Sequence, residues 1–348
     1  MTTFALIGSG FRARMFLKVA RELGTIRCGG AVVRTQRPLD VPVFTSLDEC
    51  LREVSIDFVL TATPSPVTPH VIATAVDRGL PVLAETPPAA DLDGLRALWS
   101  AVGDSGLVQV AEQYPMMPSH AARAALVATG AIGTPTQVQV SSTQHYHAIA
   151  LIRSLLRGGR GPVSVRSTRF TAPLVSPLSR AGWTDDEEAH PATTTIATLD
   201  FGEERSGVYD FTEQQTRNQL RFRRLTVRGS AGELHDDEVV RMAGPHTLVR
   251  SPLVRRQTGY DLDLAGYDTE HISFGSELLY RNPYLGHRWM DDEIAMATLL
   301  ERTASWVRGD GPEPYPLAEG AHDQQLALAI EQSADSDSAV TTSREAWT

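Results

Sequence analysis

The stretch FALIGSGFRA, residues Phe4–Ala13, decides the fold of the N-terminal half. Its apolar beginning predicts a buried strand, and apolar residues at helical spacing over residues 16–23 predict a helix directly after it. The turn between them reads G-x-G-x-x-A: Gly8 suits the tight turn, Gly10 lets the backbone approach a pyrophosphate, and Ala13 allows close packing of helix on strand. This order predicts a dinucleotide-binding unit, with cofactor contacts from Gly8, Ser9, Gly10, Phe11 and Arg12.

Further apolar runs at residues 31–33, 57–62, 81–84 and 107–111 alternate with helical patterns. Such alternation is typical of an α/β fold with a parallel, doubly wound sheet. Ligands of these sheets bind at the carboxyl ends of the strands. The residues that follow the strands are therefore expected at the cofactor: Arg34, Thr63, Pro64, Glu85, Thr86, Pro87 and Glu112.

Arg34 stands where a side chain would contact the adenosine ribose of a dinucleotide. An acidic residue there favours NAD, whereas an arginine accommodates the 2′-phosphate of NADP. Arg34 therefore favours NADP slightly, but arginine is also common on surface loops. The expected cofactor is therefore NAD or NADP.

From Val163 onward the pattern changes. Residues 164–172, 194–201, 207–212 and 220–228 largely alternate polar and apolar residues, which predicts an open, mostly antiparallel sheet that could serve contact with a second copy. We therefore expect a Rossmann domain at residues 1–118, an α+β domain at residues 119–348, and a homo-oligomer through the C-terminal sheet. Residues 255–286 lack periodicity and are predicted to form a long loop that shapes a pocket.

Three motifs resemble the Gfo/Idh/MocA oxidoreductase family: the glycine turn, Thr63-Pro64, and Glu85-Thr86-Pro87, where the family has E-K-P. The resemblance extends over most of the chain and implies NAD(P)-dependent hydride transfer on a sugar-like substrate. In the family, the lysine of E-K-P lies near the nicotinamide and helps to polarise the reacting oxygen. Thr86 stands in its place here, and Lys18, the only lysine of the chain, falls in the first predicted helix.

A second family feature concerns His147. The strand at 136–140 is predicted to end at residues 144–147, and a helix is predicted over 148–156. The family typically has a histidine at the head of this helix, which His147 matches. Thr143 and Ala150 stand where the family has two aspartates, so both acids are missing.

His145 and His147 alternate with Tyr146, and on a strand end both histidines would face one side. Histidine, with an ordinary pKa near ~6.5, is the natural proton carrier where lysine is absent. We predict His147 and His145 as the acid/base residues, assisted by Tyr146 and Tyr114. The alternatives are two structural histidines, or a metal pair, for which no third ligand is evident nearby. No metal is therefore expected.

Other polar and aromatic residues are candidates for the substrate. They neighbour the predicted site in sequence, or they lie on the predicted loop or just after it. The candidates for substrate binding are Gln113, Arg153, Tyr284, His287 and Arg288.

Composition narrows the class of protein. A net charge of −10 over 348 residues argues against a nucleic-acid partner, and no apolar run is long enough to cross a membrane. Two cysteines are too few for a disulfide framework. No signal peptide precedes the first strand, so the cytoplasm is the expected location.

The leading hypothesis is hydride transfer between NAD(P) and a sugar-like hydroxyl or carbonyl, with histidine in place of lysine. One alternative is a redox-neutral glycosidase that oxidises its sugar transiently. Another is imine reduction, which needs a weaker acid because an imine is protonated more easily than a ketone. A nucleotide-binding pseudoenzyme is the alternative outside catalysis.

Overall fold

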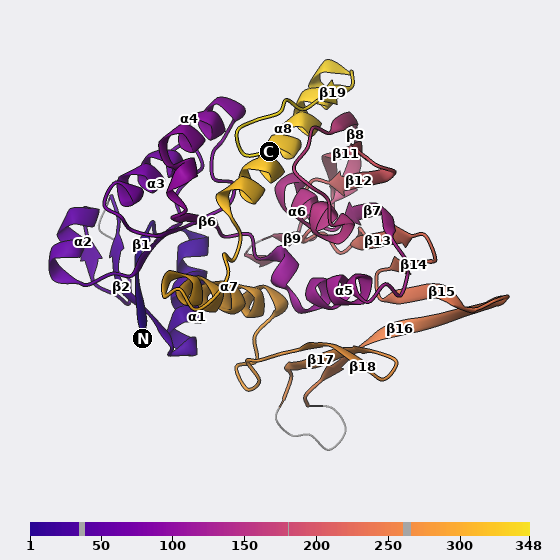
Figure 1. Ribbon diagram of the computed structural model, residues 1–348, viewed down its shortest axis with the longest axis horizontal. Coiled ribbons are helices and arrows are strands. Elements are labelled where there is room, and N and C mark those ends of the chain that lie inside the picture. Colours follow the sequence, from indigo (N-terminus) through magenta and orange to yellow (C-terminus); the bar gives the residue numbers. More distant parts are fainter. Residues whose placement is uncertain (35–38, 180, 260–265) are drawn as a thin grey trace.

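The computed structural model describes residues 1–34, 39–179, 181–259 and 266–348. It contains two main sheets, each with its own helices (Figure 1). The first sheet is parallel and the second is larger and mostly antiparallel, so the predicted fold class is confirmed. The boundary between residues 118 and 119 stays a prediction; the first α-helix after the parallel sheet is α5 (Pro118–Ala128).

The parallel sheet has the strand order β3-β2-β1-β4-β5-β6. The order reverses between β1 and β4, which is the switch point where doubly wound sheets bind ligands. Its strands are β1 (Thr2–Ile7), β2 (Ile26–Val32), β3 (Val43–Phe44), β4 (Phe58–Thr61), β5 (Val82–Ala84) and β6 (Val108–Val110). Its helices are α1 (Phe11–Leu23), α2 (Leu47–Glu53), α3 (Thr68–Val76) and α4 (Leu92–Val102).

The sequence explains why these elements form. Strand β1 is apolar on both faces because helices cover both, and its side chains from Phe4 to Leu6 are fully buried. Helices α2 and α4 begin at Ser46 and Asp91, whose side chains accept hydrogen bonds from backbone N–H groups of the first turn. Helix α1 differs, because Gly10 stands at its start and offers no side-chain cap.

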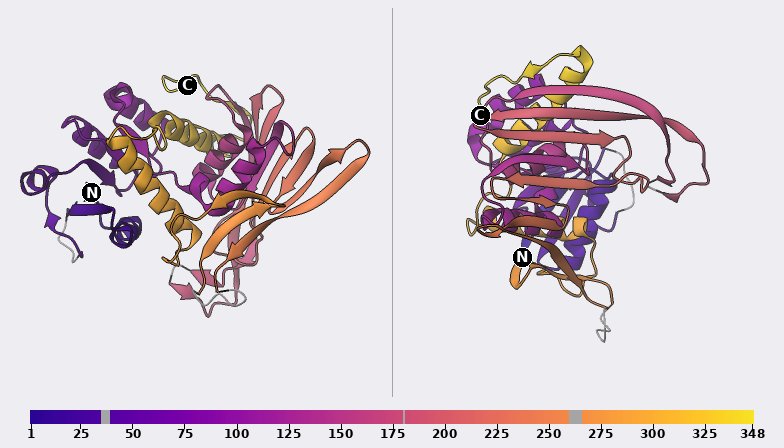
Figure 2. Two further views of the ribbon diagram at one scale, coloured as in Figure 1. Left: turned by 60° about the horizontal axis from the view of Figure 1, so that its bottom comes forward. Right: turned by 90° about the vertical axis from the view of Figure 1, so that its right-hand side faces the viewer.

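The second sheet has eleven strands in the order β18-β17-β16-β15-β14-β13-β7-β12-β11-β8-β19. All neighbours are antiparallel except β7 and β12. The right-hand view of Figure 2 shows this sheet nearly face on, with helices behind it. The strands are β7 (Pro135–Ser141), β8 (Ser164–Val175), β11 (Ala189–Gly202), β12 (Arg205–Thr212), β13 (Arg224–Gly229), β14 (Gly232–His235), β15 (Glu238–Gly244), β16 (Thr247–Gln257), β17 (Thr269–Phe274), β18 (Glu277–Arg281) and β19 (Val340–Thr341). A separate hairpin joins β9 (Leu178–Ser179) and β10 (Gly182–Trp183).

Three long helices join the two sheets. Helix α6 (His145–Leu156) packs between the large sheet and α8 (Leu317–Ser336), and α7 (Asp291–Val307) packs on α1 of the first domain. The buried Arg153 ties α6 to α8, since it donates to Asp323 Oδ1 and to Glu319 Oε2, each at 2.5 Å. The second half of the chain therefore supports the first.

The prediction of one long loop over residues 255–286 is wrong. The end of β16 and the whole of strands β17 and β18 lie in this range, and residues 260–265 lie outside the described part. The pattern is hard to recognise because register shifts interrupt both strand pairs. Among the helices of the described residues, none is long and apolar enough to span a membrane.

Gly8 gives a test of the turn that organises the first domain. It has φ +126°, and an added Cβ would lie 2.3 Å from the backbone oxygen of Ala62. We expect Gly8→Ala to lower the free energy of unfolding by about 2 kcal/mol or more, because the turn and the end of β4 must move apart.

Gly10→Ala is the matched control for this substitution. Gly10 has φ −72°, and an added Cβ meets nothing within 4 Å. Its free energy of unfolding should stay within about 0.5 kcal/mol of the parent value in a urea titration. Equal losses in the two variants would contradict the role assigned to Gly8.

Candidate functional site

A cavity of about 1080 Å³ opens at the carboxyl ends of the parallel strands. Its far wall comes from the part of the chain after the parallel sheet. The residues of this wall are Gln144, His147, Arg217 in the loop between β12 and β13, and Asp292 of α7. Ligand sites usually have volumes of about 300–1,000 Å³, so this cleft is large enough for a dinucleotide and a substrate. Of the predicted site residues, those that line it are Gly8, Ser9, Gly10, Phe11, Arg12, Arg34, Thr63, Pro64, Glu85, Thr86, Gln113, Tyr114 and His147.

One end of the cleft fits a pyrophosphate. The N-terminus of α1 borders it without a side-chain cap, so the backbone N–H groups of its first turn and the helix dipole favour an anion. The open space beside Gly10 gives such an anion room. Arg34 is exposed at the end of β2, and no described residue pairs with it, so it is free to meet the adenosine ribose or a 2′-phosphate.

Arg12 joins three segments at the floor of the cleft. Its Nε donates to Glu85 Oε1 at 2.6 Å, and its Nη1 lies 3.4 Å from Asp292 Oδ2. Gln113 donates to the other oxygen of Asp292 at 3.0 Å. Burial raises the pKa of Glu85, and the Arg12 guanidinium opposes that rise. Because Arg12 is committed to two carboxylates, it positions Glu85 beside the cofactor space.

A histidine–carboxylate pair lies on the opposite wall. His147 Nδ1 and Glu112 Oε2 are 2.6 Å apart, and the Glu112 side chain is fully buried. The imidazole stacks on Tyr114, with ring centroids 4.2 Å apart. Since Nδ1 donates to the carboxylate, Nε2 is the nitrogen left to exchange a proton with a ligand in the cleft. Glu112 does not line the cleft and acts through His147.

His145 lies on the other side of α6. The helix begins at His145, three residues before the predicted start, so the expectation that both histidines face one side is wrong. Residues two apart on a helix point about 200° apart. His145 Nε2 lies 2.8 Å from Glu331 Oε1, and its ring neighbours Tyr209 in a separate cavity of about 580 Å³.

Two further predicted residues of α6 are buried away from the cleft. The Tyr146 hydroxyl is buried against α8, where it would lie 2.9 Å from a Cβ added at Gly320, and burial raises the pKa of this phenol. Arg153 is committed to its two carboxylates on α8. Neither side chain lines the cleft, so the predicted roles in proton transfer and substrate binding are not supported by their positions.

The predicted substrate residues beyond β18 also lie elsewhere. Tyr284 donates to Glu301 of α7 at 2.9 Å, and His287 stacks on Trp289 at 4.2 Å. Tyr284 and Trp289 belong to the core that packs α7 against α1, and His287 is exposed beside it. Arg288 reaches the neighbourhood of Gly266. Pro87 lies in the E-T-P-P turn but does not line the cleft.

Sequence reasoning missed three residues of the far wall: Gln144, Arg217 and Asp292. The sequence around Asp292 does contain a pattern that could have indicated this residue, because the first turn of the helix that begins at Asp291 has three acidic residues. The sequence around Arg217 contains no such pattern, since this residue lies in a loop between strands and only the folding of that loop brings it to the cleft.

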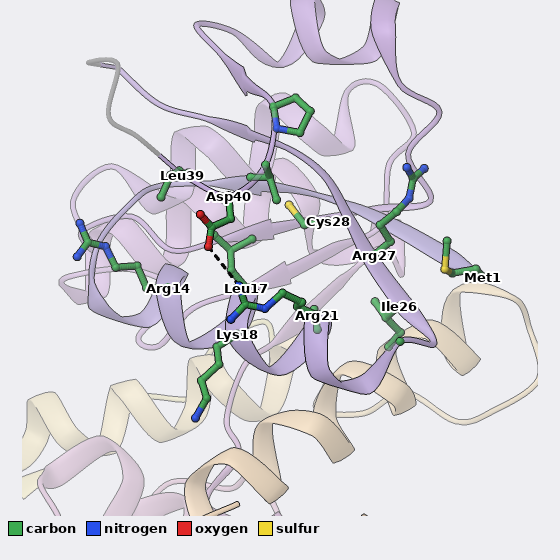
Figure 3. A pocket seen from close by; sticks show the side chains of 14 residues that line it. Met1, Arg14, Leu17, Lys18, Arg21, Ile26, Arg27, Cys28, Leu39 and Asp40 are labelled. Carbon is green, nitrogen blue, oxygen red and sulfur yellow. Dashed lines mark hydrogen bonds and ion pairs between the residues drawn. The ribbon is translucent and has the colours of Figure 1, made fainter. Parts of the chain in front are cut away.

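The lysine missing from the E-T-P-P turn is not supplied from elsewhere. Figure 3 shows a different cavity, of about 580 Å³, between α1, β2 and residues 39–42, where Arg21 pairs with Asp40. Lys18 borders that cavity and pairs with Glu293 of α7 at 2.5 Å. Across the described ranges, no three His, Cys, Asp or Glu side chains come together as metal ligands.

The sequence comparisons with known proteins match about a third of the chain, and the family model matches its N-terminal part. Residues 2–114 match the family model GFO_IDH_MocA, described as an oxidoreductase family with an NAD-binding Rossmann fold. An inositol 2-dehydrogenase of Rubrobacter xylanophilus is 31% identical over 121 residues, which is 34% of this chain and 34% of that protein. The match therefore spans about a third of that relative.

Solved structures match over nearly the whole chain. A myo-inositol dehydrogenase from Corynebacterium glutamicum is similar with a TM-score of 0.67 at 20% identity, covering 99% of this chain and 100% of that one. An oxidoreductase from Agrobacterium radiobacter, solved in complex with NAD+, L-tartaric acid and magnesium, has a TM-score of 0.70 at 14% identity, covering 97% and 98%. At these identities the likeness shows a shared fold.

His120 makes stability depend on pH. Its ring stacks on Tyr114. Burial and the charges of Arg123 and Arg255 lower the pKa of His120 to about 3, whereas the pKa of histidine in an unfolded chain is about 6.5. The unfolded state therefore takes up the proton first. The contribution of neutral His120 is complete above pH ~6.5 and is lost as the pH falls toward 3, with about 2 kcal/mol lost at pH 5.

We expect His120→Gln to lose less stability than the parent protein between pH 7.5 and pH 5. The measurement is urea unfolding at both pH values. His246→Gln, at an exposed histidine, is the control and should follow the parent. Parallel pH dependence of all three proteins would contradict a neutral, buried His120.

Proposed function

We propose that this chain, which belongs to the Gfo/Idh/MocA oxidoreductase family through its N-terminal domain, transfers hydride between NAD(P) and a sugar-like hydroxyl or carbonyl. The observation that carries the proposal is the pair of His147 with the buried Glu112, 2.6 Å apart, at a cleft that fits a dinucleotide. A titratable pair in this position is what the reaction requires besides the cofactor.

The glycine turn and the free N-terminus of α1 would hold the pyrophosphate, and Arg34 would meet the adenosine ribose. Thr63, Pro64, Glu85 and Thr86 would then border the nicotinamide end of the cofactor. When bound, the nicotinamide accepts or supplies the hydride. The protein supplies the orientation of the two reactants and the path of the proton.

His147 acts as the acid/base residue in this proposal. In the oxidative direction its Nε2 accepts the proton of the reacting hydroxyl, and Glu112 stabilises the imidazolium that forms. In reduction the same nitrogen returns the proton to the carbonyl oxygen. Glu112 fixes the orientation of the ring through Nδ1, and the stacking on Tyr114 restricts its rotation. No lysine is needed for these steps.

The lining of the cleft supports a substrate that carries several hydroxyl groups. Gln113 Oε1 and Glu85 Oε2 are buried without a hydrogen-bond partner among the described residues, and both side chains line the cleft. Acceptors left unsatisfied in this way cost stability unless a ligand donates to them. The relatives named as inositol dehydrogenases agree with a polyol or sugar.

The large sheet is where we expect a second copy to associate. Phe170 and Ile196 lie on its strands β8 and β11 with 56% and 39% of their surfaces exposed. Exposed apolar residues on an open sheet favour an interface. A homo-oligomer of this kind would leave the cofactor cleft free.

His147→Ala tests the proposed proton transfer. We expect kcat for NAD(P)-dependent oxidation of a polyol to fall at least about 100-fold, because the hydroxyl loses its proton acceptor. NAD(P)H absorbance with inositols and simple sugars measures the rate.

His145→Ala is the matched control, since it makes the same change on the other side of α6 and should retain turnover. Full activity of His147→Ala would overturn the assignment. NADH binding without turnover of any substrate would favour a pseudoenzyme. Release of an aglycone without accumulation of NADH would favour a redox-neutral glycosidase, and turnover confined to imines would favour an imine reductase.

A further inference from the structure

The loop between β12 and β13 is fixed by two buried amides. Gln215 Nε2 donates to Ser141 O and to Phe222 O, both at 2.7 Å, and its Oε1 accepts from Thr212 N. Asn218 Nδ2 donates to Val175 O at 2.8 Å. Both side chains are at most 3% exposed. The loop therefore holds one conformation without help from a ligand.

Arg217 stands between these two amides and lines the cleft. It is half-buried, and no described residue gives it a carboxylate or a side-chain hydrogen bond. Two neighbouring side chains of the same space have carboxylate partners, whereas Arg34, the other arginine without a partner among the described residues, lies at the end of β2. Arg12 is held by Glu85 and Asp292, and His147 is held by Glu112. A preorganised guanidinium without a partner is a site for an anion.

The position of Arg217 favours the substrate over the cofactor. Its loop is bonded to Ser141, three residues before Gln144, on the segment that leads into His147. The pyrophosphate of the cofactor has its own site at the N-terminus of α1, and Arg34 serves the ribose end. Arg217 thus lies on the wall of the second domain, with Gln144 and His147.

We propose that the substrate is a sugar or polyol that bears an anionic group, a carboxylate or a phosphate, and that Arg217 binds this group. The inference rests on the proposed function, because it places the reacting hydroxyl at His147. Arg217 is then the residue that selects acidic over neutral sugars, and its two-pronged guanidinium suits both kinds of oxyanion.

The experiment measures binding to the NAD+-saturated protein by calorimetry. The probes are D-glucose, D-glucuronate and D-glucose 6-phosphate, together with the matching galactose series. An acidic probe is expected to bind at least about 10-fold more tightly than its neutral parent, and Arg217→Gln should remove this preference. Arg217→Lys should restore part of it. The carboxylate and phosphate probes show which anion the site takes.

Arg34→Gln is the matched control, because it removes the other unpaired arginine of the cleft. It should keep the preference for acidic sugars and alter only the affinity for NADP relative to NAD. The dissociation constant of NADH, measured by fluorescence, should change less than about 2-fold in Arg217→Gln.

Three outcomes overturn the inference while NADH binding is intact: tighter or equal binding of neutral sugars, no binding of any acidic probe, and a preference that survives in Arg217→Gln. A large loss of NADH affinity in Arg217→Gln also overturns it, since Arg217 would then bind a cofactor phosphate. Failure of the parent protein to bind NADH would instead refute the proposed function.

Discussion

The Arg12 guanidinium holds the cleft together. It lies between Glu85, at the end of β5, and Asp292, at the start of α7, so one cation links the glycine turn, the fifth strand and the second half of the chain. The pairs are partly buried, so removing Arg12 would leave the Glu85 carboxylate without its partner in a poorly solvated place. The cleft thus depends on a contact between segments about 280 residues apart in sequence.

Local patterns were sufficient for the parallel sheet and its edge. Strand-to-helix alternation fixes which residues end a strand, and all parallel strands end on one side, so Gly8, Arg34, Thr63 and Glu85 could be placed together without a structure. The family motif likewise leads to His147. The placement at the sheet edge depends only on short-range periodicity and on the handedness of the fold, whereas His147 depends on the resemblance to the family.

Other parts of the site depend on information that no local pattern contains. Helix α6 begins three residues before its predicted start, so His145 and His147 both lie on the helix and face different cavities. Arg153 is polar and close in sequence to His147, but Asp323 and Glu319, about 170 residues away, take it into the protein interior. Arg217 reaches the cleft only through the amide contacts that fold its loop.

The exchange of lysine for histidine changes what the cleft can do as a proton carrier. A lysine at position 86 would project from the same turn as Glu85, next to Arg12, and would add a fourth charge to the cluster of Arg12, Glu85 and Asp292. In the proposed mechanism His147 would carry the proton from the opposite wall, with a fully buried carboxylate behind it. The proton would then move on a different side of the cleft from the turn that would hold the cofactor.

The C-terminal segments, which are synthesised last, cover apolar surface on two helices of the N-terminal domain. Helix α7 packs on α1, and Trp347 is buried among Ala89, Leu95 and Ala321, beside Trp99 of α4. The N-terminal domain emerges first during synthesis, but these surfaces stay uncovered until the final segments appear. A nascent chain must therefore carry exposed apolar surface on two helices for most of its translation, and chaperones that bind such surface would meet it there.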